Sequence, residues 1–472
     1  MFHFAVDAQF AVAVPLAFAG SLRWCARHRG VASRSPFAHM LSRRSLGALI
    51  VLIMMGLALA SGQTLPLDHP AIGYSSLPLI DPVTELSRKI EQGQVRLAFD
   101  PVTGYLPAVL KALDIPVESQ MAVFSKTSIQ AMRIEPSNPR VLFFNDAVIV
   151  GWVRGGYLEI ASHDPRRGMV FYRLDQRPSE YRKRMAAATP ESPFTRRQDC
   201  LRCHMTAATL GVPGVLLRSV FPSRSGVPLI NAPQYDTDGR MTFDKLWGGW
   251  YVTGISGPAL HMGNLIAADE AHPELMLEGG PVHLDSLEGK CGPQTRLTPY
   301  SDIAALLVFE HQVRIMNLLT RAAWESRIAL VENHSLTQPA RAALNELADS
   351  LLFVGEAPLE GEIAGTSGFE EAFASRGPRD REGRSLRDLS LRGRLLRYPC
   401  SYMVYSKAFE ALPAEAQAAV YRRMWKALSA RPAADRDAIV EILRETKSGL
   451  PDYFRARKLE TSTTRGMKRP RG

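Results

Sequence analysis

Cysteine is scarce in this chain, which has five in 472 residues. Two of the five stand close together, whereas Cys291 and Cys400 have neither a cysteine nor a histidine within four residues. A closed zinc site needs about four ligands, usually supplied as two short-spaced pairs, so the scarcity argues against a zinc ribbon. In an oxidising compartment Cys291 and Cys400 could instead form a disulfide.

The body of the chain also lacks an excess of positive charge, although the formal net charge is +10. Residues 1–60 carry six basic side chains and one acidic one, and residues 455–472 carry seven and one. The remaining residues, 61–454, hold 44 basic against 45 acidic side chains. A nucleic-acid-binding protein concentrates positive charge on its folded body, so this distribution argues against nucleic acid as a partner.

An apolar run at residues 46–60 follows two arginines and ends in an Ala-Leu-Ala triplet. A basic start, an apolar centre and a small-residue exit together predict a secretory signal. The run is short for a membrane span, which needs about 20 residues, but an uncleaved leader stays open as a link to the membrane. Met40 stands where such a signal would begin, which makes residues 1–39 a candidate upstream extension.

Short β-branched and aromatic runs separated by turn formers predict strands between residues 121 and 174. The pair Asn145-Asp146 lies between two apolar runs and predicts a tight hairpin. Beyond residue 300 apolar residues recur at three- and four-residue steps, which is typical of a helix, and Ser301-Asp302 offers an N-cap. Other helices are expected at 85–91, 196–209, 340–353, 414–430 and 434–446, a strand-like stretch at 215–230 and a long loop at 355–394.

This order of elements predicts an α+β fold with a strand-rich N-terminal part and a helical C-terminal part. The expected organisation is a leader at 1–60, a strand-rich domain at 61–300, a helical domain at 301–454 and a basic disordered tail at 455–472.

The most specific local signal is Cys200-Leu201-Arg202-Cys203-His204, which has the spacing of a covalent c-type haem attachment site. On one helical turn both cysteines can form thioethers with the haem vinyl groups, and His204 then lies beneath the iron as its proximal ligand. Random placement of the five cysteines and eleven histidines would produce on the order of 10⁻³ such patterns. The motif occurs once, so the sequence predicts one covalent haem c in the strand-rich part.

The sixth ligand of the iron is open at this point. His261 and Met262, nearly sixty residues after the motif, are the leading candidates, and either would give a low-spin iron. His311 and Met316 on the expected long helix, and Met241, are further options, as is an iron with an open sixth position.

Two other segments have alternative interpretations. The run Trp247–Gly254 would either line a haem pocket or form an aromatic strand in a sheet core. Arg384 and Arg387 would either pair with haem propionates, since arginine offers paired donors to carboxylates, or pair with the acidic residues of their own loop.

The haem motif, Trp247–Gly254, His261-Met262-Gly263-Asn264 and the segments 383–389 and 398–402 together resemble a group of large, secreted, monohaem bacterial proteins of unknown role. The likeness spans most of residues 97–430 and separates the chain from the small all-helical cytochromes c. It implies haem binding and a periplasmic or cell-envelope location, and it brings no established reaction.

These features predict a monohaem c-type cytochrome that transfers single electrons in the cell envelope and docks a redox partner protein. An alternative is a haem enzyme of the peroxidase or oxidase type with an open sixth iron site, in which His261 or His311 acts as the distal acid–base. A third interpretation is a haem-based sensor or scaffold.

Overall fold

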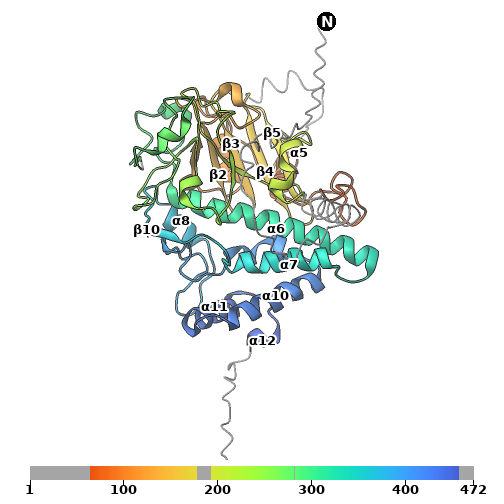
Figure 1. Cartoon of the computed structure of the whole chain (residues 1–472). Helices are drawn as coiled ribbons and strands as arrows, with labels where there is room; N and C mark the ends of the chain where they lie inside the picture. Colours follow the sequence, from red (N-terminus) through yellow and green to blue (C-terminus); the bar gives the residue numbers. More distant parts are fainter. Residues whose placement is uncertain (1–63, 178–192, 281, 456–472) are drawn as a thin grey trace, which may run out of the picture. The chain divides into compact units, whose positions relative to one another are not determined.

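The computed structural model describes residues 64–177, 193–280 and 282–455. The predicted leader at 1–60 and nearly all of the predicted tail at 455–472 lie outside these residues. The described part has the predicted α+β fold, in which a strand-rich N-terminal part is followed by a helical C-terminal part (Figure 1).

The described residues form a main antiparallel sheet of seven strands in the order β6-β5-β4-β3-β2-β1-β9. The strands are β1 (Met121–Val123), β2 (Arg140–Phe144), β3 (Val148–Trp152), β4 (Leu158–Asp164), β5 (Gly168–Leu174), β6 (Thr195–Arg196) and β9 (Trp250–Tyr251). Strands β1 to β5 follow one another as a meander, and they match the runs predicted between residues 121 and 174. Two smaller pairs join β7 (Leu217–Ser219) to β8 (Tyr235–Thr237), and β10 (Leu359–Glu362) to β11 (Arg392–Gly393).

The predicted hairpin at Asn145-Asp146 is confirmed between β2 and β3. The Asn145 side-chain oxygen accepts hydrogen bonds from the backbone N–H groups of Ala147 and Val148, at 3.0 and 2.9 Å. This Asx turn supplies locally the contacts that reverse the chain. It sets Phe144 opposite Ile149 in the ladder.

The two faces of the sheet pack into different hydrophobic cores. Leu142 and Phe144 belong to the core that contains the long helix α6 (Ile303–Asn333). Val141 and Phe143 belong to the core on the opposite face, which also takes buried side chains from α2 (Pro82–Glu91) and α3 (Leu106–Ala112). Successive strand residues point to opposite faces, so the β-meander serves both cores.

The helical part is built around α6, which packs against α7, while α7 packs against α10. Figure 1 shows α6 next to the sheet, with α7 and then α10 on its far side. The remaining helices are α7 (Gln338–Leu351), α8 (Phe369–Ser375), α9 (Lys407–Glu410), α10 (Ala414–Ser429), α11 (Ala433–Thr446) and α12 (Asp452–Arg455). The helices predicted at 85–91, 340–353, 414–430 and 434–446 therefore correspond to α2, α7, α10 and α11.

Helix α6 begins at the predicted cap, where the Asp302 carboxylate accepts the backbone N–H of Ala304 at 2.8 Å. It is apolar and long enough to cross a membrane by composition, but its apolar window is completely buried inside the protein. A core helix satisfies the same criterion, and here the sheet and α7 cover it.

Three predicted elements differ from the structure. The helix expected at 196–209 is limited to α5 (Leu201–His204) and the short 3-10 turn Ala207–Thr209, because Met205 and Thr206 leave the helical conformation between them. Of the strand-like stretch at 215–230 only β7 is a strand, and beyond its end Pro222 and Pro228, which lack an N–H, form a single isolated β-bridge with each other. The loop expected at 355–394 contains β10, α8 and β11.

Candidate functional site

The haem motif lies on α5, a single helical turn that begins after Cys200. The backbone N–H groups of Cys203 and His204 both bond to the Cys200 carbonyl, at 3.1 and 3.0 Å. Residues three apart on a helix share a face, so both cysteines lie on the same side of this turn. Cys200 is half-buried, Cys203 is exposed, and both are free thiols.

The thiol of Cys200 is a poor nucleophile as the structure stands. Burial raises its pKa to about 11, and the nearby carboxylate of Asp199 acts in the same direction. A redox-active or metal-binding cysteine needs a lowered pKa, because the thiolate is the reactive form. This environment argues against a thioredoxin-like use of the Cys200–Cys203 pair.

The His204 ring is held in the orientation that a metal-binding histidine needs. Its Nδ1 lies 3.0 Å from the Gly214 carbonyl oxygen, and a carbonyl can only accept, so Nδ1 carries the proton and Nε2 keeps its lone pair. Metal-bound histidines commonly donate their second N–H to such an acceptor. Burial is the main cause that lowers the pKa of His204, which keeps the ring in the neutral form that binds metals.

The acceptor of this hydrogen bond is fixed by α6. Asn317 on α6 accepts the backbone N–H of Val215 at 3.0 Å and donates to the Val215 carbonyl at 2.7 Å. A Cβ added to Gly214 would lie 2.3 Å from the Asn317 side-chain oxygen, so the close approach requires glycine. Asn317, Val215 and Gly214 therefore set the position of His204.

The sheet forms the other side of the His204 environment. The Phe171 ring on β5 lies 4.8 Å from the His204 ring, centre to centre. Phe171 belongs to the core that contains α6. The imidazole is thus positioned directly by Phe171 of the sheet and indirectly by α6, which holds the backbone of Val215 next to its acceptor Gly214.

Two arginines act electrostatically on His204. Arg140 pairs with Glu159 at 2.6 Å, and Arg218 pairs with Asp236 at 3.2 Å, and both positive charges favour the neutral imidazole. The Nε atom of Arg140 is buried and has no hydrogen-bond partner within the described residues. Cationic donors of this kind suit the carboxylates of a haem edge.

Sequence reasoning missed these arginines and named Arg384 and Arg387 instead. Arg384 pairs with Asp380 and Glu441, at 2.7 and 2.9 Å. Arg387 pairs with Asp146 and lies against the rings of Phe373 and Tyr402. Both side chains therefore have protein partners. Nothing in the spacing of Arg140 or Arg218 signals their place, because the fold alone brings them near His204.

The leading sixth-ligand candidates are both enclosed. His261 is 1 % exposed, its ring meets Trp247 edge-on at 5.3 Å, and its Nδ1 has no hydrogen-bond partner within the described residues. Burial lowers the pKa of His261 to about 4. Met262 is fully buried, and its sulfur accepts a hydrogen bond from the Ser219 hydroxyl at 3.5 Å. Ligation by either residue remains a prediction.

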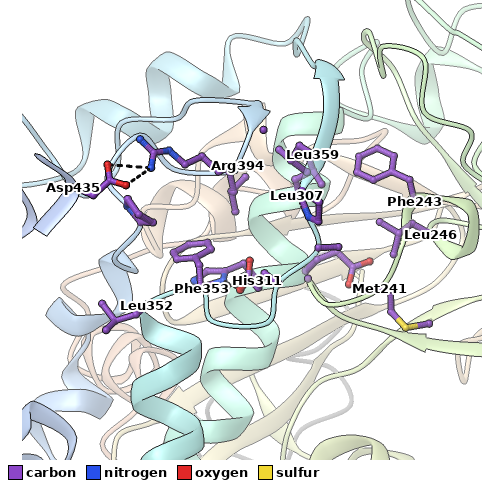
Figure 2. A pocket seen from close by; sticks show the side chains of 18 of the residues that line it. Met241, Phe243, Leu246, Leu307, His311, Leu352, Phe353, Leu359, Arg394 and Asp435 are labelled. Carbon is purple, nitrogen blue, oxygen red and sulfur yellow. Dashed lines mark hydrogen bonds and ion pairs between the residues drawn. The ribbon is translucent and has the colours of Figure 1, made fainter. Parts of the chain in front are cut away.

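The other candidates lie along α6 and the loop beside it. Both ring nitrogens of His311 are engaged, by Glu356 at 2.6 Å and by Ser401 at 2.8 Å. Met316 is fully buried and its sulfur lies 3.8 Å from the amide nitrogen of Gln312. Met241 lines a cavity together with Phe243, Leu246 and His311 (Figure 2).

The segment Trp247–Gly254 contributes to the sheet core. Trp250 and Tyr251 form β9 at the sheet edge, and Trp247 is buried in the core that contains α6. The Trp250 indole donates to the Arg218 carbonyl at 2.9 Å. The strand interpretation of this segment therefore describes its structure, and Trp250 also holds the backbone that carries Arg218.

The possible disulfide between Cys291 and Cys400 is absent from the structure. Both residues are buried free thiols. Cys400 belongs to the core that contains α6, whereas Cys291 belongs to the core on the opposite face of the sheet.

Comparison with known proteins identifies no match: no family description, curated protein or solved structure is similar to this chain. In the described part of the chain, moreover, no three His, Cys, Asp or Glu side chains are grouped so as to hold a metal ion.

Proposed function

We propose that this protein is a monohaem c-type cytochrome that transfers single electrons in the cell envelope. Cys200 and Cys203 would carry the two thioether bonds, and Nε2 of His204 would bind the iron. The observation that carries the proposal is the coincidence of the motif with the hydrogen bond from His204 Nδ1 to the Gly214 carbonyl. That hydrogen bond leaves Nε2 as the metal-binding atom.

The surroundings of the motif fit the group. The two thiols are free and share one face of α5, and Cys203 is exposed to solvent. Arg140 and Arg218 supply positive charge, and the unpartnered Nε of Arg140 offers a donor to a propionate. The haem, when bound, would supply reversible Fe(III)/Fe(II) chemistry, and the protein would orient its ligand and set its electrostatic environment.

The cell-envelope location rests on the leader at residues 46–60 and on the chemistry of attachment. The run has the pattern of a secretory signal. Haem c is attached outside the cytoplasm, so an exported chain and this motif support each other. A redox partner protein follows from the proposed electron transfer.

The test is the absorption spectrum of the full chain produced in a bacterial periplasm together with haem c maturation proteins. We expect a haem spectrum whose reduced pyridine complex is that of two thioether links. It should be lost in the Cys200→Ala/Cys203→Ala variant and kept in the Cys291→Ala control. Incorporation in the double variant equal to that in the control would contradict the proposal.

The same samples separate electron transfer from the haem-enzyme alternative. A low-spin iron that does not bind added cyanide or carbon monoxide supports electron transfer, because both axial positions are then filled by protein side chains. A high-spin iron that binds these molecules readily would replace the electron-transfer proposal with an enzyme or a sensor.

A further inference from the structure

Three arginines meet where the turn between β4 and β5 lies near α6. Arg166 and Arg167 belong to the turn, and Arg327 belongs to α6. The Arg167 Nε donates at 3.4 Å to the carbonyl of the residue before Tyr74, and the Tyr74 ring lies 6.4 Å from the ring of Trp324 on α6, centre to centre. Arg327 follows Trp324 by about one helical turn, so the two side chains lie on the same side of α6. Tyr74 therefore connects the turn to the part of α6 that carries Arg327.

Two of these side chains, Arg166 and Arg327, have no carboxylate partner within the described residues. Arg166 is exposed, and its guanidinium has no hydrogen-bond or ion-pair partner there. Arg327 is half-buried. Its guanidinium donates to the Ala411 carbonyl, whereas its Nε is buried without a hydrogen-bond partner in this part of the chain. Burying a cation is unfavourable unless an opposite charge pairs with it, so Arg327 carries a charge that calls for an anion.

The carboxylate of the turn is already engaged by other groups. Asp164 is fully buried and accepts the backbone N–H groups of Ile80, Arg166 and Arg167, at 2.9, 2.9 and 3.0 Å. The Arg167 guanidinium adds an ion pair with Asp164 at 3.3 Å. These contacts shape the turn and hold Arg167 in place. The three arginines and this one carboxylate together leave an excess of two positive charges.

The acidic residues on either side of Arg327 along α6 do not remove this excess. Glu325 pairs with Arg321 at 2.5 Å, and Glu332 lies 3.1 Å from the His69 ring. Each carboxylate therefore has a partner of its own.

The pKa of Arg327 reflects the same crowding of positive charge. Burial is the main cause that lowers this pKa to about 10, and Arg166 and Arg167 lower it further, whereas Asp164 acts in the opposite direction. The guanidinium stays charged at neutral pH, so the folded protein keeps the repulsion among the three arginines. A bound anion would relieve that repulsion.

The chemistry of the donors favours a phosphate group over a simple ion. A guanidinium presents its N–H donors in a planar fork that matches the oxygens of a phosphate. A phosphate monoester carries about −1.5 to −2 charges at neutral pH, which corresponds to the excess of two. Arg166 is exposed, so such a group can approach from solvent.

We propose that Arg166 and Arg327 bind a phosphate group, with Arg167 as a third positive charge that Asp164 holds in place. Inorganic phosphate and the headgroup of an anionic phospholipid both present this chemistry. The site uses none of the residues proposed to hold the haem, so the two proposals can fail separately.

The test is calorimetric titration of the purified full chain, at constant ionic strength, with inorganic phosphate and with vesicles of phosphatidylglycerol. We expect saturable binding that chloride does not displace. Binding of inorganic phosphate identifies a soluble ligand, and binding of the vesicles alone identifies a lipid headgroup. Binding of neither probe, or displacement by chloride at the same ionic strength, would overturn the proposal.

Variants assign the binding to these arginines. Arg166→Gln and Arg327→Gln should each weaken binding of the effective probe about tenfold, which is the scale of one charge-assisted hydrogen bond. Arg327→Lys keeps the charge without the fork and should weaken it less. Arg166 is exposed, so its variant tests the site even where Arg327→Gln lowers stability. The matched control is Arg224→Gln, at an exposed arginine in the loop after β7. An affinity of Arg166→Gln equal to that of the control would overturn the proposal.

Discussion

The turn that carries the haem motif and the helix that supports it are stabilised in opposite ways. Helix α5 has four residues, none of them fully buried, and a single turn does not persist by itself. Helix α6 has 31 residues, most of them buried, and begins at an Asp302 cap. The comparison teaches that the motif is local in sequence, whereas its geometry depends on remote residues of the helical part.

The largest expected effect comes from removing the hydrogen bonds between Asn317 of α6 and the backbone of Val215, which connect α6 to the segment that follows α5. Asn317→Ala leaves the Val215 N–H and carbonyl unpaired, so we expect the free energy of unfolding to fall by about 3 kcal/mol, at 1–3 kcal/mol for each buried group. Chemical denaturation measures it, with Asn333→Ala at the exposed end of α6 as the control. Equal stability of the two variants would show that α6 does not hold the His204 segment.

A smaller effect should follow from filling the space between the same elements. Gly214→Ala places a Cβ against Asn317, and we expect a loss of about 2 kcal/mol, typical of overpacking, with a changed spectrum of the iron because the His204 acceptor moves. The control is Gly279→Ala, where an added Cβ meets nothing within 4 Å. A Gly214→Ala protein with unchanged stability and an unchanged spectrum would contradict this account of His204 positioning.

Two buried groups, one on the sheet and one on α6, should make the free energy of unfolding depend on pH in opposite directions. His163 on β4 is buried and its Nε2 lies 3.0 Å from the Thr320 hydroxyl, and burial lowers its pKa from 6.5 to about 4. The unfolded chain then binds a proton that the folded one does not, so stability is lost as the pH falls from 6.5 toward 4. The slope is at most about 1.4 kcal/mol per pH unit.

Glu310 on α6 should give the free energy of unfolding the opposite dependence on pH. Its pKa rises from 4.5 to about 8 on burial, so the folded state holds the proton longer and stability is lost as the pH rises from 4.5 toward 8. Denaturation curves of His163→Gln should therefore lose slope only on the acid side, and those of Glu310→Gln only on the alkaline side. If a variant instead reduced the pH dependence on the other side, the direction of the pKa shift inferred for the substituted group would be wrong.

The strands and long helices were predictable because their signals are local. Alternation and turn formers located β1 to β5, and the apolar spacing with Asp302 located α6. The extent of α5 was not, since the non-helical backbone conformation of Met205 and Thr206 ends it. Likewise the Cys200–His204 motif can be recognised from five consecutive residues. The roles of Asn317 and Arg218, by contrast, depend on contacts with residues that are distant in the sequence. No sequence pattern distinguishes Glu310 from any other helical glutamate.

The smallest expected effect concerns the charge around the proposed haem. Arg218→Gln removes a positive charge near His204, and we expect the reduction potential to fall by on the order of tens of millivolts, because the oxidised iron is then favoured. Redox titration measures it. Arg240→Gln is the matched control, since Arg240 is also an exposed arginine paired with an aspartate. A shift equal to that of the control would contradict the proposal that the charge of Arg218 acts on the haem bound at His204.

The most direct test of the central claim is the mass of the intact polypeptide, purified from a periplasm that attaches haem c and measured under denaturing conditions. A covalent link through Cys200 and Cys203 predicts that the mass of one haem stays with the chain, and that it disappears when both residues are alanine. A polypeptide of unmodified mass, produced beside a known c-type cytochrome that does acquire haem, would contradict the account.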